Sequence, residues 1–180
     1  MLHGDIGIDI LRGNDAAGAD DGVQDRFVFD TPLGVAAGVS PNCDEIEMPV
    51  FLIGGEAVDD QILLENSIFT ALLSTTGSQV GTLRAIDYTE GAGATGNAMT
   101  ASAGIYNDTT TGQLWYNPTG RVAGDSVMFA VVITGVPNGS ATLSADEFLL
   151  AEAGRPHRLP HDRWQRRCPR SRAPPHRRTW

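Results

Sequence analysis

The chain has 180 residues and carries 22 acidic side chains against 13 basic ones, all of which are arginine. Hydrophobic residues make up 41% of the sequence, but no run approaches the roughly 20 apolar residues that a membrane-spanning helix needs. Two cysteines cannot form a disulfide framework. These counts exclude a membrane protein, a collagen and a disulfide-rich miniprotein, and the first residues do not have the pattern of a secretory signal.

The charge changes abruptly along the chain. Residues 1–151 contain 20 acids and four arginines, a net charge of −16, whereas residues 152–180 contain nine arginines and two acids, a net charge of +7. Such a change indicates a boundary between two chemically different segments. A strongly acidic region repels nucleic acid and anionic membranes, so we expect neither nucleic acid nor stable membrane insertion. It favours a cation as the partner.

The first thirty residues contain one clear nonapeptide and one broken one. Residues 4–12 fit the pattern G-G-x-G-x-D-x-U-x, except that Asp5 replaces the second glycine, and a second unit begins at Gly13 and loses register. Glycines let the chain reverse within a few residues, and turn carbonyls with an Asp carboxylate offer the hard oxygen ligands that Ca²⁺ prefers. The calcium ligands predicted from this pattern are Gly4, Ile6, Gly7, Asp9 and Asp25. Two nonapeptides make one coil of a β-roll, so turns on the same side are about eighteen residues apart, and Asp9 is predicted to pair with the turn near Asp25.

The acids that surround this pattern have a plainer interpretation. Turn formation, with no metal ligation, is expected of Asp5, Asn14, Asp15 and Asp20. Solvated positions in loops or at strand ends are expected of Asp44, Asp59 and Asp60. A site built from one and a half repeats is incomplete, so its affinity is expected near the weak range of about 10⁻⁴–10⁻³ M known for extracellular calcium modules.

The rest of the acidic region is expected to be rich in β structure. In chain order the patterns predict a strand over 26–29, a strand over 60–64, a single helical turn over 67–72, a loop over 74–104, a hairpin from 105–106 and 113–116, a buried central strand over 127–133, and a helix N-terminus at the capping box 144–147. The predicted core residues are Phe27, Phe29, Leu114, Tyr116, Phe129, Val131 and Phe148.

Several short blocks occur in an order that matches a known family. They are the strand at 25–31, N-x-D-x-I at 42–46, D-x-I-x-L at 60–64, the pieces 105–107 and 111–117, which resemble a Y-[DN]-x-x-T-G-x-L-x-Y-[DN] hairpin, and an L-[ST]-x-x-D-F-like end at 143–148. Together they resemble the C-terminal region of RTX (haemolysin-type calcium-binding) proteins, including the serralysin-like secreted enzymes. The chain departs from that family in its single clear repeat, in Pro49 and in its long tail.

The resemblance implies an all-β fold in three parts. Residues 1–30 would be a degenerate remnant of a parallel β-roll, 31–151 a β-rich C-terminal and secretion region, and 152–180 a disordered Arg/Pro-rich tail. It also implies Ca²⁺ as cofactor, a type I secretion ABC-transporter system as partner, and an extracellular location. The expected function is a calcium-binding module of a secreted protein, coupling Ca²⁺ binding to folding after export. The alternative is a fragment of a calcium-dependent surface adhesin or surface-layer protein.

Catalysis and zinc binding are not expected of this chain. Neither H-E-x-x-H nor G-x-S-x-G occurs, and the family places its chemistry upstream of the repeats. The tail holds His157 and His161 at a spacing that one helix face permits, but Pro156 and Pro160 disrupt such a helix. The chain is therefore predicted to be an appended module and not an enzyme.

Overall fold

The computed structural model describes residues 1–13, 24–48, 60–134 and 143–152. Within these ranges the chain forms short strands and two 3₁₀ turns, η1 and η2. The elements are β1 (Leu2–His3), β2 (Ile10–Arg12), β3 (Arg26–Phe29), β4 (Gly38–Met48), β5 (Gln61–Glu65), β6 (Gly81–Thr82), η1 (Ala85–Asp87), β7 (Tyr88–Gly91), β8 (Gly104–Asp108), β9 (Gln113–Asn117), β10 (Val127–Thr134), η2 (Ala145–Glu147) and β11 (Phe148–Ala151). The described residues leave out positions 14–23 of the broken second nonapeptide, Pro49, and the basic tail from 153 onward.

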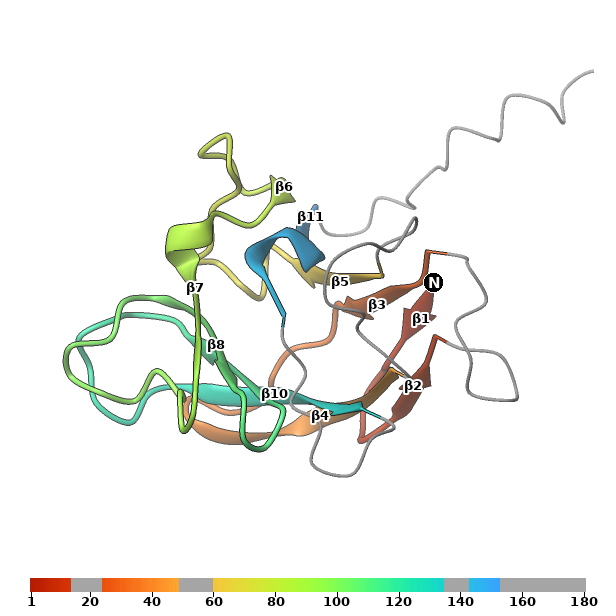
Figure 1. Ribbon diagram of the computed structural model, residues 1–180, viewed down its shortest axis with the longest axis horizontal. Coiled ribbons are helices and arrows are strands. Elements are labelled where there is room, and N and C mark those ends of the chain that lie inside the picture. Colours follow the sequence, from red (N-terminus) through yellow and green to blue (C-terminus); the bar gives the residue numbers. More distant parts are fainter. Residues whose placement is uncertain (14–23, 49–59, 135–142, 153–180) are drawn as a thin grey trace, which may run out of the picture.

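The strands form two sheets that face each other across the core (Figure 1). One sheet has the order β1-β3-β5-β11-β6, and the other has the order β2-β4-β10-β9-β8-β7. Parallel pairs join β1 to β3, β3 to β5 and β5 to β11 in the first sheet, and β2 to β4, β4 to β10 and β7 to β8 in the second. The antiparallel pairs are β6 with β11 in the first sheet, and β9 with both β8 and β10 in the second. The prediction of a parallel β-roll leading into a β-rich region was therefore wrong, because both sheets mix parallel and antiparallel strands.

Two features of the chain explain this departure from a β-roll. A roll built from nonapeptides adds one turn about every eighteen residues, but here Leu11 pairs with Ile46 and Phe27 pairs with Ile62, both thirty-five positions later. The hairpin of β8 and β9 then reverses the chain, and β10 returns to pair antiparallel with β9 and parallel with β4. The long connections and this reversal prevent the regular stacking of identical turns.

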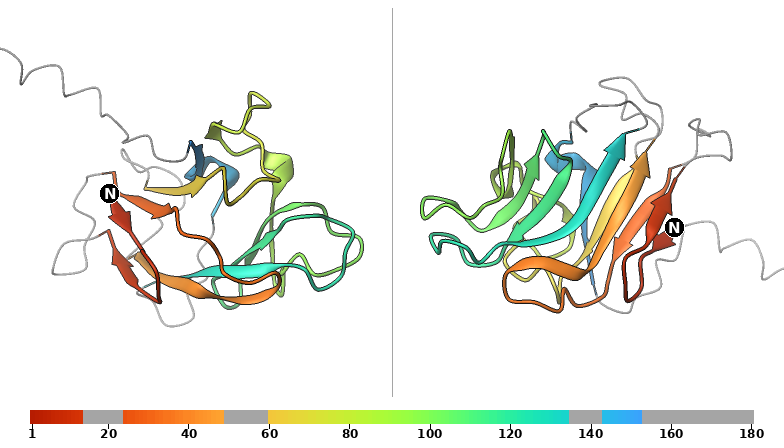
Figure 2. Two further views of the ribbon diagram at one scale, coloured as in Figure 1. Left: turned by 180° about the vertical axis from the view of Figure 1, so that it is seen from behind. Right: turned by 90° about the horizontal axis from the view of Figure 1, so that it is seen from below.

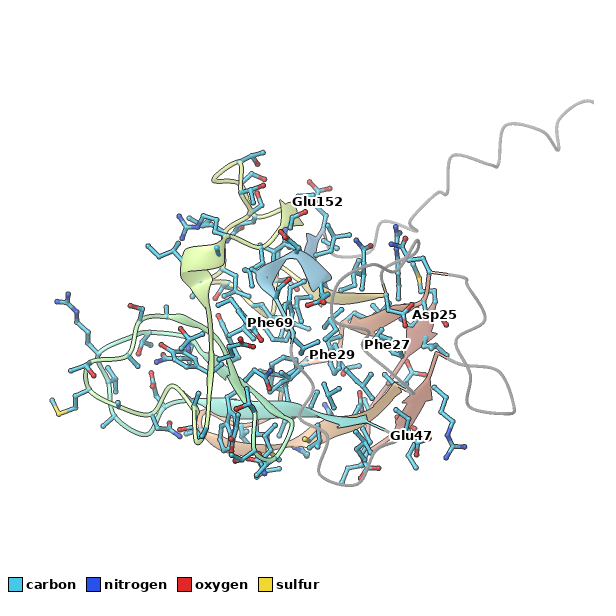
Figure 3. The ribbon with its side chains drawn as sticks, viewed as in Figure 1. Asp25, Phe27, Phe29, Glu47, Phe69 and Glu152 are labelled. Atoms are coloured by element: carbon cyan, nitrogen blue, oxygen red, sulfur yellow. The ribbon has the colours of Figure 1, made fainter. Side chains whose placement is uncertain are left out.

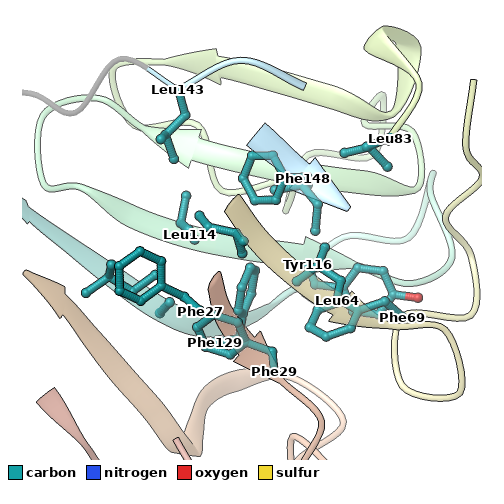
Figure 4. Packing of buried hydrophobic residues seen from close by; sticks show 14 of the residues in the cluster. Phe27, Phe29, Leu64, Phe69, Leu83, Leu114, Tyr116, Phe129, Leu143 and Phe148 are labelled. Carbon is teal, nitrogen blue, oxygen red and sulfur yellow. The ribbon is translucent and has the colours of Figure 1, made fainter. Parts of the chain in front are cut away.

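The core lies between the two sheets and contains apolar side chains from both (Figure 4). Six of the seven predicted core residues are buried: Phe27, Phe29, Leu114, Tyr116, Phe129 and Phe148. Val131 is only half-buried, and Val132 is buried instead. The reason is a shift of register against β9, where Met128 pairs with Trp115 and Ala130 pairs with Leu114. Relative to β9, β10 therefore has one extra residue, which changes which of its later side chains face inward.

The local predictions differed in accuracy. The strands over 26–29 and 127–133 and the antiparallel hairpin are present as β3, β10 and β8–β9. Residues 67–72 form bends and turns, without a helix, and the predicted loop over 74–104 contains β6, η1 and β7. At 144–147 the capping box is formed, but it closes only the 3₁₀ turn η2, because the apolar residues that follow join the first sheet as β11.

Candidate functional site

A polar contact joins the first repeat to β4. Asp9 lies just before β2, and its backbone N–H donates to Oδ1 of Asp44 at 3.0 Å. Glu45 returns a main-chain bond, because its N–H donates to the carbonyl oxygen of Asp9 at 2.8 Å. Asp44 is only 1% exposed, whereas Asp9 is exposed. Asp44 was predicted to be a solvated acid in a loop or at a strand end, but it lies within β4 and is buried.

The glycines of the first repeat surround this acid pair. A Cβ atom at Gly4 would lie 1.9 Å from Oδ2 of Asp44, so only glycine lets the carboxylate approach the backbone here. Gly7 has a φ of +133°, and its N–H donates to Oδ1 of Asn42 at 3.0 Å. Ile6 is 85% exposed, which leaves its side chain in solvent. The predicted residues Gly4, Ile6, Gly7 and Asp9 thus lie in one turn that contacts β4 through Asn42 and Asp44.

The electrostatics of the pair favour a cation. Burial raises the pKa of Asp44 to about 6; the N–H of Asp9 opposes that rise, and the carboxylate of Asp9 adds to it. Within the described residues the ion pairs are His3–Asp30, Arg12–Glu47 and Arg84–Asp87, and none of them includes Asp9 or Asp44. Above about pH 6 two carboxylates therefore lie near each other without a described cationic side chain.

Asp25, which is labelled in Figure 3, makes the same kind of contact in the other sheet. It lies just before β3, its N–H donates to Oδ1 of Asp60 at 2.8 Å, and the N–H of Gln61 donates to its carbonyl oxygen at 2.8 Å. A Cβ atom at Gly13 would lie 2.9 Å from Oδ2 of Asp25. The structure therefore places Asp9 beside Asp44 and Asp25 beside Asp60, whereas the sequence pattern predicted that Asp9 pairs with the turn near Asp25.

Asp44 and Asp60 are the residues that the sequence analysis missed as candidates. The signal was present, because Asp9 and Asp44 are thirty-five positions apart and so are Asp25 and Asp60. Thirty-five is not a multiple of nine, so a search for nine-residue repeats does not detect this spacing. Each pair contributes only two acids, and the part of the chain that the structure describes contains no group of three or more His, Cys, Asp or Glu side chains placed to hold a metal.

Another candidate site is a surface hollow at the β7–β8 end of the second sheet. A cleft of about 460 Å³ is lined by residues of the 93–102 segment together with Ile86, Thr89 and Tyr106. Its lining contains small, apolar and neutral polar residues and no Asp, Glu, His or Cys. Because this lining offers no carboxylate, imidazole or thiol, the acid pairs are the better candidate for a cation site.

Comparison with known proteins gives no relative for this chain: no protein-family model, no curated protein and no solved structure matches it. The resemblance to RTX proteins therefore rests on the sequence blocks alone. Among the described residues there is no helix that is long and apolar enough to cross a membrane.

Proposed function

We propose that this chain is a calcium-binding module of a secreted RTX-type protein, and that Ca²⁺ binding is coupled to its folding after type I export. The observation that carries the proposal is the pair formed by Asp9 and the buried Asp44. Asp9 is exposed, whereas Asp44 is 1% exposed. Burial and the carboxylate of Asp9 raise the pKa of Asp44 to about 6. A bound cation would relieve both causes of that rise.

The available ligand atoms suit a hard cation. Ca²⁺ takes six to eight oxygen ligands from carboxylates, main-chain carbonyls and water. Asp9 and Asp44 supply carboxylates, and the turn that contains Gly4, Ile6 and Gly7 supplies carbonyl oxygens. Asp25 and Asp60 would form a second, similar position in the other sheet. At either position the protein supplies fewer oxygen ligands than Ca²⁺ takes, so water would occupy the remaining coordination sites.

The sequence separation within each pair links binding to folding. Asp9 and Asp44 become neighbours only when β2 pairs with β4, and Asp25 and Asp60 only when β3 pairs with β5. An unfolded chain lacks both pairs, so Ca²⁺ would bind the folded state alone. The stabilisation then equals RT ln(1 + [Ca]/Kd), about 1.4 kcal/mol at ten times Kd. In a calcium-poor cytosol the acidic chain would stay export-competent, and it would fold once outside the cell.

A calcium titration tests this proposal directly. At pH 7.5 a concentration of about 10 mM Ca²⁺ is expected to raise the melting temperature of the chain, since this is about ten times the weak end of the affinity range of such modules. The rise should shrink at pH 5, where Asp44 is mostly protonated. It should also shrink in Asp9→Ala. Differential scanning calorimetry measures the shift, and isothermal titration calorimetry measures the heat of binding.

Glu90→Gln is the matched control, because it removes one negative charge from the exposed β7 at the opposite edge of the same sheet. This variant should respond to Ca²⁺ like the unmodified chain. The proposal is wrong if Ca²⁺ gives neither heat nor stabilisation, or if Asp9→Ala and Glu90→Gln respond to it equally.

A further inference from the structure

The cleft at the β7–β8 end lies where the segment 93–102 packs against the outer face of the second sheet. Thr89 of β7 is in register with Tyr106 of β8, and both side chains line the cleft. Ile105 belongs to the core and Tyr88 packs against it, so Thr89 and Tyr106 lie on the opposite face of the sheet. The green segments that form the cleft project from the end of the molecule away from the N-terminus (Figure 2).

The segment 93–102 has no helix or strand of its own, but hydrogen bonds hold its middle and its end. The hydroxyl of Tyr106 donates to the carbonyl oxygen of Ser102 at 2.9 Å and accepts its N–H at 3.0 Å. Nδ2 of Asn117 donates to the carbonyl oxygen of Gly96 at 2.8 Å. Gly96 has a φ of +70°, and a Cβ atom there would lie 2.6 Å from the ring of Tyr106. The cleft is therefore preformed, which lowers the entropic cost of binding a ligand.

The side chains of the lining offer neutral hydrogen-bonding groups. None of the lining residues is charged, although the chain carries 22 acids and 13 arginines. Asn97 accepts the N–H of Ser126 with its Oδ1 at 3.1 Å, which leaves its amide NH₂ group as a donor. No described residue bonds to the hydroxyls of three lining threonines, which are Thr89, Thr95 and Thr100. A charged ligand would lose hydration here without meeting an opposite charge, so the lining favours a neutral ligand that carries hydroxyl groups.

A buried hydroxyl next to the lining has no partner. Ser126 is 1% exposed, and its Oγ makes no hydrogen bond to any described residue. A Cβ atom at Gly96 would lie only 2.9 Å from this oxygen, so the hydroxyl lies directly against a lining residue that has no side chain. Buried polar groups in folded proteins are satisfied by protein, water or ligand. A ligand hydroxyl, or a water that bridges to one, would satisfy Ser126.

We propose that this cleft binds a neutral sugar ring. The hydroxyl groups of the sugar pair with the amide and hydroxyl groups of the lining, and its C–H groups pack against the methyl groups of Ala94, Ala98 and Ala101. The volume of about 460 Å³ is within the range of small-molecule sites. In the described lining Ile86 is the only aliphatic side chain larger than alanine, which is too little for a lipid chain, and a phosphate group would meet no cationic side chain. The site includes neither acid pair and does not require calcium.

An NMR titration of the full chain with neutral sugars tests this proposal. Glucose, galactose, mannose and N-acetylglucosamine are each added up to about 50 mM in EDTA, which separates the result from calcium binding. At least one of them is expected to give saturable shifts of the amides of 93–102, with a Kd of about 1–10 mM, as befits a small ligand in an open cleft. The uronic acid and the amino sugar of the same configuration should bind at least about tenfold more weakly.

Two pairs of variants locate the binding in the cleft. Ala98→Phe places a ring in the cleft and should abolish the shifts, whereas Ala92→Phe adds the same ring to an exposed residue outside the lining and should leave Kd unchanged. Thr95→Val removes a lining hydroxyl with little change of shape and should raise Kd about threefold or more. Thr109→Val removes a hydroxyl outside the lining and should have no effect.

The proposal is overturned if none of the four neutral sugars gives a saturable shift, if the shifts lie outside 86–106, or if Ala98→Phe binds as tightly as the unmodified chain. Equal binding of the charged sugars overturns the preference for a neutral ligand. Equal binding in Thr95→Val overturns the role of that hydroxyl.

Discussion

Replacing Phe129 by alanine is expected to lower the free energy of unfolding by about 3–5 kcal/mol. Phe129 is fully buried, and its ring packs edge-on against Phe29 and Phe69, with both centroid distances at 5.2 Å. Phe29 belongs to β3 in the first sheet and Phe129 to β10 in the second, so the lost ring is one that holds the sheets together. Equilibrium unfolding in urea, followed by tryptophan fluorescence, measures the change.

Ile86→Ala is the control for this prediction. Ile86 is 77% exposed, so its truncation should change the free energy of unfolding by less than about 0.5 kcal/mol. If Phe129→Ala lowers the free energy of unfolding by less than about 1 kcal/mol, the surrounding side chains fill the cavity, and the ring does not support the packing of the two sheets.

Replacing Asp44 by asparagine is expected to stabilise the chain above pH 6 and to have a smaller effect near pH 4. The folded-state pKa of Asp44 is raised to about 6, above its usual value of 3.8. Below pH 4 the carboxyl group is protonated in both the folded and the unfolded chain. Between pH 4 and 6 the unfolded chain releases the proton first, so the free energy of unfolding falls with rising pH by about 1.4 kcal/mol per pH unit.

By pH 7.5 this penalty amounts to about 2–3 kcal/mol, and it stays constant at higher pH. Asparagine keeps an oxygen that can accept the N–H of Asp9 but carries no charge, so the variant should escape the penalty. Urea unfolding at several pH values between 4 and 8, in EDTA, measures the difference. The prediction is contradicted if Asp44→Asn is equally or less stable than the unmodified chain throughout that range.

Asp108→Asn should show the opposite pH dependence. Burial raises the pKa of Asp108, but hydrogen bonds from Gly93, Thr110 and Thr111 outweigh it, and the pKa falls to about 2. Its ionised form therefore stabilises the folded chain above pH 4, and this contribution is lost as the pH falls toward 2. The variant should be destabilised at pH 7, and the deficit should shrink in acid. The two variants together distinguish a carboxylate that opposes folding from one that supports it.

The pH dependence of Asp44 also bears on the proposed calcium site. A bound cation favours the ionised carboxylate, so saturating Ca²⁺ should flatten the fall in stability between pH 4 and 6. If Ca²⁺ leaves this slope unchanged while the slope itself is present, the acid pair exists but does not bind the ion. That result would leave the contact between Asp9 and Asp44 in place but would contradict the proposal that this pair binds Ca²⁺.

Local patterns were sufficient for the elements that depend on neighbouring residues. The run of apolar and β-branched residues over 127–133 indicated a central strand, and β10 lies between β4 and β9. The spacing of Ser144 and Glu147 indicated a capping box, which is formed at η2. In these cases the information lies within a few residues of the feature, because a continuous apolar run favours a strand buried on both faces and a capping box is closed by its own neighbouring residues.

The sequence by itself determined the acidic character of residues 1–151, several strands, the hairpin and most of the core, because composition and short-range periodicity encode them. Only the tertiary structure decided the pairing of β2 with β4, which buries Asp44 beside Asp9. The same holds for the extra residue of β10 relative to β9, which leaves Val131 half-buried and buries Val132. Strand register across thirty-five residues depends on the length of the connections and on the packing of both sheets. A change of one residue reverses the faces of a strand, and no local pattern contains that choice.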